Sequence, residues 1–122
     1  MVVAVVGASR DRNKFGNKAV RAHLNRGFDV YPVNLHEKEI EGLDVYRSVL
    51  DIPAEIDRVI VYLPPETTSD VLDDIAQKGT KEIYFNPGSW NDRVVAKANA
   101  AGLNVIIECA IIAIGESPAN YS

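Results

Sequence analysis

The segment with the clearest potential for chemistry is GASRDRNKFG, residues 7–16, which follows an apolar run. Gly7 and Ala8 let a ligand come close to the backbone, and Ser9 offers a hydroxyl. A helix that begins near Gly16 would turn its unpaired backbone N–H groups toward this loop, where hydrogen bonds and the helix dipole stabilise a phosphate group. Three basic side chains could add charge: Arg10, Arg12 and Lys14. The competing interpretation is a glycine-containing turn that carries a solvated basic loop.

The loop departs from the G-x-G-x-x-G fingerprint of dinucleotide-binding proteins, because Ala8 and Ser9 stand where a later glycine belongs. The second apolar run ends in YPVN, so Asn34 lies about where NAD enzymes carry an acidic residue. A carboxylate there would repel a phosphorylated ribose, and its absence is compatible with coenzyme A (CoA) or NADP. Alternatively, Pro32 and Asn34 only shape the exit of a strand.

Two further apolar runs end in residues suited to a binding wall. In VYLPPETT, Pro64 and Pro65 cannot continue a sheet, so we expect a rigid exit that could lie beside an adenine. Thr67 or Thr68 is expected to cap the helix that follows. The alternative is a simple strand stop and helix start.

The run FNPGSW predicts a turn at residues 86–88, with Ser89 or Asn91 as the cap of the last helix. Trp90 could anchor the core, the usual place of a lone tryptophan, or cover the flexible arm of a ligand.

The only cysteine, Cys109, ends the last apolar run in IIECA. It is either a buried apolar residue or a thiol near the reactive end of a ligand. Glu108 is a possible acid or base, but it has no identifiable partner. With one cysteine and two histidines, neither a disulfide nor a structural metal site is expected. We identify no catalytic residue set.

The elements that must position these residues alternate along the chain, which predicts an α/β fold with a mostly parallel sheet of five to six strands in a three-layer sandwich. The expected strands are Val2–Val6, Asp29–Val33, a short edge piece at Leu43–Tyr46, Val59–Leu63, Glu82–Phe85 and Asn104–Glu108. The expected helices are Gly16–Asn25, Thr67–Lys78 and Asn91–Ala100, with a single turn at Arg47–Leu50 and a surface loop at Leu35–Gly42. Glycines that end the helices support this reading: Gly27, Gly79 and Gly102. In such a sheet, ligands bind beyond the carboxyl ends of the strands.

Composition fits one globular domain over residues 1–122. The net charge of −4 argues against binding to nucleic acid, which requires a surplus of Lys and Arg. No apolar run approaches the roughly 20 residues that span a membrane, and no basic leader precedes the first run, so we expect a cytoplasmic protein.

Taken together, the strand ends resemble the small CoA-binding protein family, whose domain is related to the N-terminal CoA-binding domain of the succinyl-CoA synthetase alpha subunit. The resemblance covers Val2 to about Cys109. Its segments here are VAVVGAS, GFDVYPVN, IEGLDVYRSVLDIP, VIVYLPPETT and GLNVIIEC. The specificity of the resemblance lies in the occurrence of all five segments in this order and at suitable spacing.

The resemblance implies a Rossmann-like fold that holds CoA across the carboxyl edge of the sheet. It implies that the residues facing the phosphates of CoA are Gly7, Ala8, Ser9, Lys14, Phe15 and Gly16. The residues that it places beside the nucleotide are Val33, Asn34, Leu63, Pro64 and Thr68. The residues that it places along the pantetheine arm are Asn86, Pro87 and Gly88, with Cys109 near the thiol. The family often has an arginine before the final cysteine, where this chain has Glu108. The family also has a more basic tail than this chain.

We therefore expect a module that binds CoA or acyl-CoA without independent catalysis, as a carrier, a sensor or the partner of an acyl-CoA enzyme. The synthetase has a second domain with a phosphorylated histidine, and we expect no such domain in these 122 residues, so the shared fold does not imply ligase activity. The alternatives are an NADP-dependent oxidoreductase domain and a protein-interaction domain on the same scaffold. A homodimer is plausible; the apolar segment 110–114 is a candidate contact, or else the last piece of the core.

Overall fold

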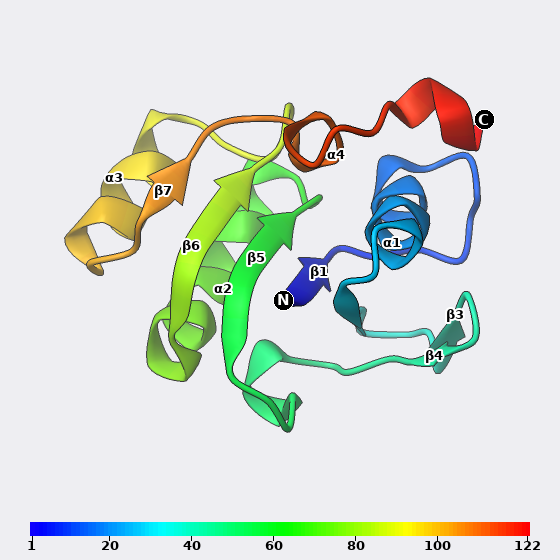
Figure 1. Cartoon of the computed structure of the whole chain (residues 1–122). Helices are drawn as coiled ribbons and strands as arrows, with labels where there is room; N and C mark the ends of the chain where they lie inside the picture. Colours follow the sequence, from blue (N-terminus) through cyan, green and yellow to red (C-terminus); the bar gives the residue numbers. More distant parts are fainter.

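The computed structural model describes residues 1–122 and contains one parallel sheet of five strands. The strands are β1 (Val2–Val6), β2 (Asp29–Val33), β5 (Ile56–Val61), β6 (Thr80–Phe85) and β7 (Val105–Ile106). Their spatial order is β2-β1-β5-β6-β7 (Figure 1). The chain therefore extends the sheet first to one side of β1 and then to the other, and the direction reverses between β1 and β5. This order confirms the predicted Rossmann-like α/β fold.

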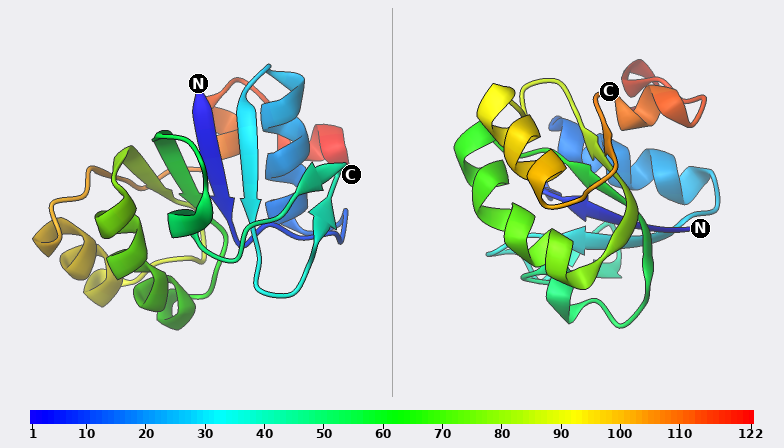
Figure 2. Two further views of the ribbon diagram at one scale, coloured as in Figure 1. Left: turned by 90° about the horizontal axis from the view of Figure 1, so that it is seen from below. Right: turned by 90° about the vertical axis from the view of Figure 1, so that its left-hand side faces the viewer.

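Helices cover both faces of the sheet, as Figure 2 shows. On one face lie α1 (Phe15–Asn25), the short α4 (Ala110–Ala113) and a 3-10 helix (Pro118–Tyr121). On the other face lie α2 (Pro65–Lys78) and α3 (Asp92–Ala100). The three predicted helices are thus present, and the three-layer arrangement is confirmed.

The core consists of two apolar clusters, one on each face of the sheet. In β1, Val3 and Val5 belong to the cluster beneath α1, whereas Ala4 and Val6 belong to the cluster beneath α2 and α3. Successive strand residues point to opposite faces, so a strand covered on both sides must be apolar throughout. This requirement explains why β1 reads VVAVV.

A histidine lies inside the first cluster. His23 of α1 is fully buried, with its Nδ1 atom 2.7 Å from the carbonyl oxygen of Ala19 and its ring edge-on to Phe28. Burial lowers the pKa of His23, because the charged imidazolium loses its hydration. The side chain therefore acts as an uncharged core residue at neutral pH.

The start of α2 corrects one prediction. The helix begins at Pro65, not at Thr67, and Pro64 occupies the N-cap position without a side-chain hydrogen bond. Proline suits the first turn of a helix, because its fixed φ is helical and its missing N–H is not needed there. Neither threonine caps the helix, and the Thr68 hydroxyl donates instead to the carbonyl of Leu63 at 3.2 Å.

The segment between β2 and β5 also differs from the prediction. The expected surface loop and edge strand form an antiparallel hairpin of β3 (Glu39–Ile40) and β4 (Leu43–Asp44). Its turn residues, Glu41 and Gly42, both have positive φ, which suits a two-residue hairpin connection. Only a single bridge from Tyr46 to Val33 joins this segment to the main sheet. The expected helical turn is a 3-10 helix at Val49–Asp51.

The predicted last strand, 104–108, is shortened to β7, and α4 follows it. Ala110 and Ile111 are fully buried in the cluster beneath α1, which confirms the core alternative for these two residues, while Ile112 is exposed. None of the helices has both the length and the apolar character needed to span a membrane.

Candidate functional site

A cleft of about 290 Å³ opens where β1, β5 and β6 end. It lies at the carboxyl edge of the sheet, beside the point where the strand order reverses. Its walls are Gly7, Lys14, Phe15, Gly16, Tyr62, Leu63, Asn86, Pro87, Gly88, Ser89 and Cys109. The structure therefore brings together residues predicted from the first loop, from the β5 and β6 exits and from the segment after β7.

Two glycines let three backbone segments meet at the floor of this cleft. A Cβ atom on Gly7 would lie 2.5 Å from the carbonyl oxygen of Tyr62, and Gly7 has a φ of +90°. A Cβ atom on Gly16 would overlap the carbonyl oxygen of Gly7. A side chain on Gly7 would push the β1 exit away from the β5 exit, and one on Gly16 would push α1 away from the β1 exit, so both glycines are required sterically.

The first turn of α1 faces the cleft and has backbone N–H groups without a hydrogen-bond partner. The backbone N–H groups of Phe15 and Gly16 make no hydrogen bond within the protein, and the N-cap residue Lys14 has no side-chain cap. The first turn of α1 contains no acidic residue, whereas those of α2 and α3 contain Glu66 and Asp92. Free N–H groups, the helix dipole and the Lys14 charge together suit an anionic group.

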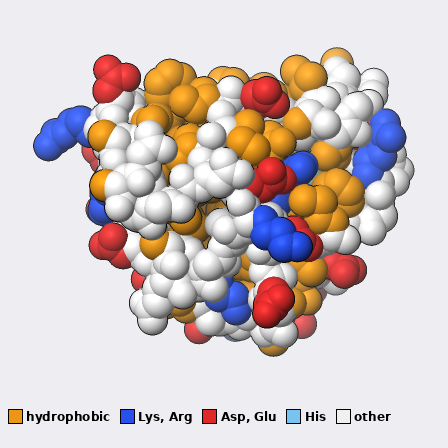
Figure 3. Space-filling model, turned by 60° about the vertical axis from the view of Figure 1, so that its left-hand side comes forward, with side chains coloured by type: hydrophobic (Ala, Val, Ile, Leu, Met, Phe, Trp, Pro, Cys, Tyr) orange, Lys and Arg blue, Asp and Glu red, His pale blue; other side chains and the backbone are white.

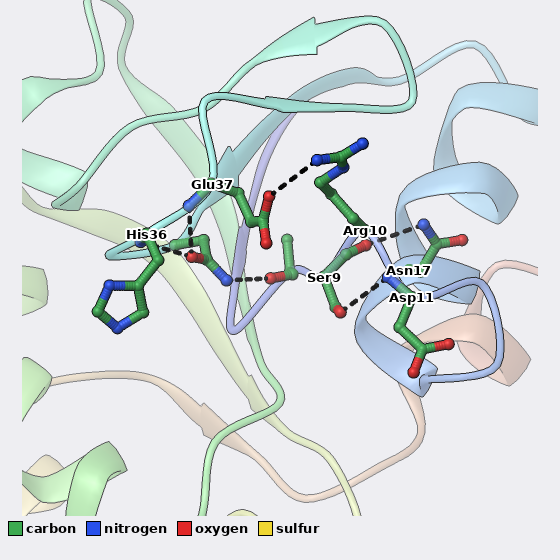
Figure 4. A network of polar contacts seen from close by, with 8 residues as sticks. Ser9, Arg10, Asp11, Asn17, His36 and Glu37 are labelled. Atoms are coloured by element: carbon green, nitrogen blue, oxygen red, sulfur yellow. Dashed lines mark hydrogen bonds and ion pairs between the residues drawn. The ribbon is translucent and has the colours of Figure 1, made fainter.

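Side-chain hydrogen bonds fix the loop that precedes α1, as the close-up of Figure 4 shows. The Ser9 hydroxyl accepts from the N–H of Asp11 at 3.0 Å, and the Ser9 carbonyl accepts from the side chain of Asn17 at 2.9 Å. Asn34 donates to the carbonyl of Ala8 at 2.8 Å and accepts from the N–H groups of His36 and Glu37. The exit of β2 is thereby tied to the exit of β1.

A second hollow, more polar, lies beside this network. It measures about 590 Å³ and is lined by Arg10, Arg12, His36, Glu37, Lys38, Glu39 and Glu41. Arg10 pairs with Glu37 at 3.6 Å and Arg12 pairs with Glu41 at 3.5 Å, and both arginine side chains remain largely exposed. Exposed pairs of this kind are weak, so both guanidinium groups can change partner at little cost.

The β6 exit is held by Asn86, whose side chain is almost fully buried. Its amide nitrogen donates to the carbonyl of Val61 at 3.0 Å, and its oxygen accepts from the N–H of Ala110 at 2.8 Å. The Ser89 hydroxyl closes the turn by donating to the Asn86 carbonyl. One side chain thus joins the ends of β5 and β6 to the start of α4.

Tyr62 and Cys109 complete the inner wall of the cleft. Burial raises the pKa of the Tyr62 phenol, and its hydroxyl finds no hydrogen-bond partner in the protein. Cys109 is half-buried. The sequence did not predict Tyr62 as a site residue, although Tyr62 directly precedes the predicted Leu63. The sequence indicated Ser89 only as a helix cap. The observed cap is Asn91, whose side chain accepts a hydrogen bond from the N–H of Val94.

Six predicted site residues lie outside the walls of the cleft: Ala8, Ser9, Val33, Asn34, Pro64 and Thr68. Ala8, Val33 and Thr68 are buried. Ser9 and Asn34 are half-buried and bonded within the loop network, and Pro64 is exposed. No group of three or more His, Cys, Asp or Glu side chains is placed to hold a metal ion.

Comparison with known proteins identifies the family of this chain. The protein-family model described as "CoA binding domain" matches residues 1–115 of this chain. The alpha subunit of an ADP-forming acetate–CoA ligase II from Pyrococcus furiosus is 37% identical over 84 residues, which are 68% of this chain and 18% of that subunit. An ADP-forming acetate–CoA ligase II from Archaeoglobus fulgidus is 42% identical over 81 residues, 65% of this chain and 12% of that enzyme. The chain thus spans less than a fifth of these curated relatives.

Solved structures share both the fold and part of the sequence. A hypothetical protein from Pyrococcus horikoshii superposes with a TM-score of 0.85 at 33% identity, over 92% of this chain and 79% of that one. An acetyl-CoA synthetase of Candidatus Korarchaeum cryptofilum, solved with phosphate and ADP, superposes with a TM-score of 0.79 at 30% identity, over 88% of this chain and 25% of that one. The family match over almost the whole length leaves one conclusion: this chain belongs to the CoA-binding domain family.

Proposed function

We propose that the protein binds CoA or acyl-CoA in the cleft at the carboxyl edge of the sheet and serves an acyl-CoA enzyme as a carrier, sensor or partner. The observation that carries this proposal is the junction of Gly7 and Gly16, which brings the free N–H groups of Phe15 and Gly16 to the strand ends. The relatives support it, since those with named activities use different acids, among them acetate, 4-hydroxybutyrate and a feruloyl group, and share CoA.

The residues of the cleft fit a phosphorylated ligand with a long neutral arm. The N–H groups of Phe15 and Gly16 would donate to a phosphate group, with Lys14 adding charge. Pro87 and Gly88 would border the arm, and Cys109 would lie toward its end. When bound, CoA would supply a thiol that carries acyl groups as thioesters.

The adenosine end would lie near the β2 exit, where the polar hollow begins. Arg10 and Arg12 line this hollow, and their weak pairs with Glu37 and Glu41 could open to receive the 3′-phosphate. Asn34 would act by holding the loop in place, because its amide is already hydrogen-bonded to the chain.

A role without catalysis of its own is supported by the titratable groups that line the cleft: Lys14, Tyr62 and Cys109. The raised pKa of Tyr62 keeps this phenol protonated, so it would not act as a base. None of the three is hydrogen-bonded to a residue that could activate it, which general acid–base catalysis would require.

The test is isothermal titration calorimetry of the ligand-free protein with CoA, dephospho-CoA, NADP and NAD. We expect micromolar or tighter binding of CoA and about tenfold weaker binding of dephospho-CoA, because a charge-assisted arginine–phosphate contact contributes about 1.5 kcal/mol. Arg12→Ala should remove most of this difference, while Arg93→Ala on the exposed face of α3 should not.

Equal affinity for CoA and dephospho-CoA would contradict the assignment of the polar hollow. Preference for NADP would support an oxidoreductase domain instead. Binding to none of the four would leave a protein-interaction role.

A further inference from the structure

A second apolar site lies one strand beyond the cleft. It is a hollow of about 400 Å³ between the exits of β6 and β7, lined by Phe85, Pro87, Gly88, Trp90, Ile107 and Glu108. Pro87 and Gly88 belong to both sites, and Glu108 directly precedes Cys109 of the cleft wall. The turn after β6 thus lines both the cleft and this hollow, which we call the outer pocket.

Large apolar side chains are left exposed in the outer pocket. Trp90 is 36% exposed and Ile107 is 45% exposed, and neither belongs to a core cluster. The expected alternative for Trp90, an anchor in the core, is therefore wrong. Figure 3 shows hydrophobic side chains gathered in the upper part of the face that it presents, with acidic side chains among them.

The rim of the outer pocket carries a negative charge without a counter-charge. Glu108 is exposed and forms no ion pair or hydrogen bond in the structure. A second carboxylate brought into this pocket would meet repulsion, whereas an uncharged apolar group would gain contacts with Trp90 and Ile107.

We propose that the outer pocket binds the acyl group of acyl-CoA and favours uncharged apolar acyl groups over those that end in a carboxylate. The inference rests on the proposed CoA-binding function. A thioester emerges at the end of the pantetheine arm, and the cleft that would hold this arm shares the wall of Pro87 and Gly88 with the outer pocket. An acyl group that passes this wall would enter an apolar space before reaching solvent.

The experiment compares CoA, hexanoyl-CoA and succinyl-CoA by calorimetry on the full chain. We expect hexanoyl-CoA to bind about tenfold more tightly than CoA, which corresponds to about two well-buried methylenes at three- to fourfold each, because the open pocket would leave the rest of the acyl chain in contact with solvent. Succinyl-CoA should show no gain over CoA. Since Trp90 is the only tryptophan, its fluorescence should change with hexanoyl-CoA and much less with CoA.

Variants can distinguish the contribution of the acyl group to binding from that of the rest of the ligand. Ile107→Ser should leave the affinity for CoA within about twofold and reduce the hexanoyl gain to about threefold or less. Leu50→Ser is the matched control, because Leu50 is 39% exposed and lies before β5, outside the outer pocket. Glu108→Gln should improve binding of succinyl-CoA and leave that of hexanoyl-CoA unchanged.

The outcomes distinguish this inference from the function on which it rests. A protein that fails to bind CoA at all would refute both. A protein that binds CoA but shows no preference for hexanoyl-CoA, or keeps the preference after Ile107→Ser, would refute the outer pocket alone.

Discussion

At the scale of single residues, the site depends on the absence of a Cβ atom at two glycines. Gly7 and Gly16 bring the β1 exit, the β5 exit and the start of α1 within van der Waals contact, and a methyl group at either position would overlap a backbone carbonyl. The glycines have no side chain that could contact a ligand. They determine how close a ligand can come to the N–H groups of Phe15 and Gly16.

Gly7→Ala should therefore damage both stability and binding. We expect a loss of about 2–4 kcal/mol in the free energy of unfolding, from the positive φ together with the overlap at Tyr62, measured by urea denaturation. The control is Gly42→Ala, because Gly42 also has a positive φ, at +78°, but has no atom within 4 Å of its added Cβ. Equal losses for the two variants would show that the overlap at Tyr62 is relieved without cost.

The sequence predicted the glycines and Lys14 because they follow one strand directly and face one helix start. It could not show what Asn34 and Thr68 do. Both were predicted to border a nucleotide, which stays a prediction, and the structure shows their side chains donating hydrogen bonds to the carbonyl groups of Ala8 and Leu63. Such bonds depend on which neighbouring strand exits come close, which one chain segment does not reveal.

At the scale of elements, the loops after β1, β5 and β6 were located correctly, and β1 and β2 have the predicted bounds, whereas several other element ends differ from the prediction. α2 begins two residues before the expected start, because Pro65 is a good first helical residue as well as a strand breaker. The hairpin of β3 and β4 was missed because its strands are two residues long and its turn is Glu41–Gly42, not a typical Asn-Gly or Asp-Gly pair.

Asn86 is where several elements depend on one side chain. Asn86→Ala would leave the Val61 carbonyl and the Ala110 N–H without partners in a buried region, so we expect a loss of about 2–4 kcal/mol in the free energy of unfolding. Chemical denaturation measures this loss. Asn104→Ala is the control, because the Asn104 side chain is exposed and makes only a 3.4 Å bond to Lys81; a loss as small as that of the control would contradict the linking role.

At the scale of the whole molecule, the strand order β2-β1-β5-β6-β7 decides where the site can be. The alternation of apolar and helical segments was enough to predict this class of fold and the edge that carries the cleft. The net charge of −4 sets a further condition, because an anionic ligand gains only from local positive groups. The polar hollow and the first turn of α1 provide them within an acidic protein.

Binding should be visible as a stabilisation of the whole fold. CoA at 100 times its dissociation constant should raise the free energy of unfolding by about 2.7 kcal/mol, which corresponds to a rise in Tm of roughly 10 °C for a chain of this size. Thermal denaturation at increasing CoA concentration measures the effect. NAD at the same concentrations is the control, and a Tm that does not depend on CoA concentration would contradict the proposed function.

The α4 segment and the 3-10 helix after it lie against α1, although they are made about a hundred residues later. Ala110 and Ile111 fill the core beneath α1, and Arg21 donates to the carbonyl of Tyr121 at 2.7 Å. During translation, β1 and α1 leave the ribosome long before these partners exist. The apolar underside of α1 therefore stays partly uncovered while the rest of the sheet is synthesised, which makes the nascent chain more exposed to aggregation than the folded protein.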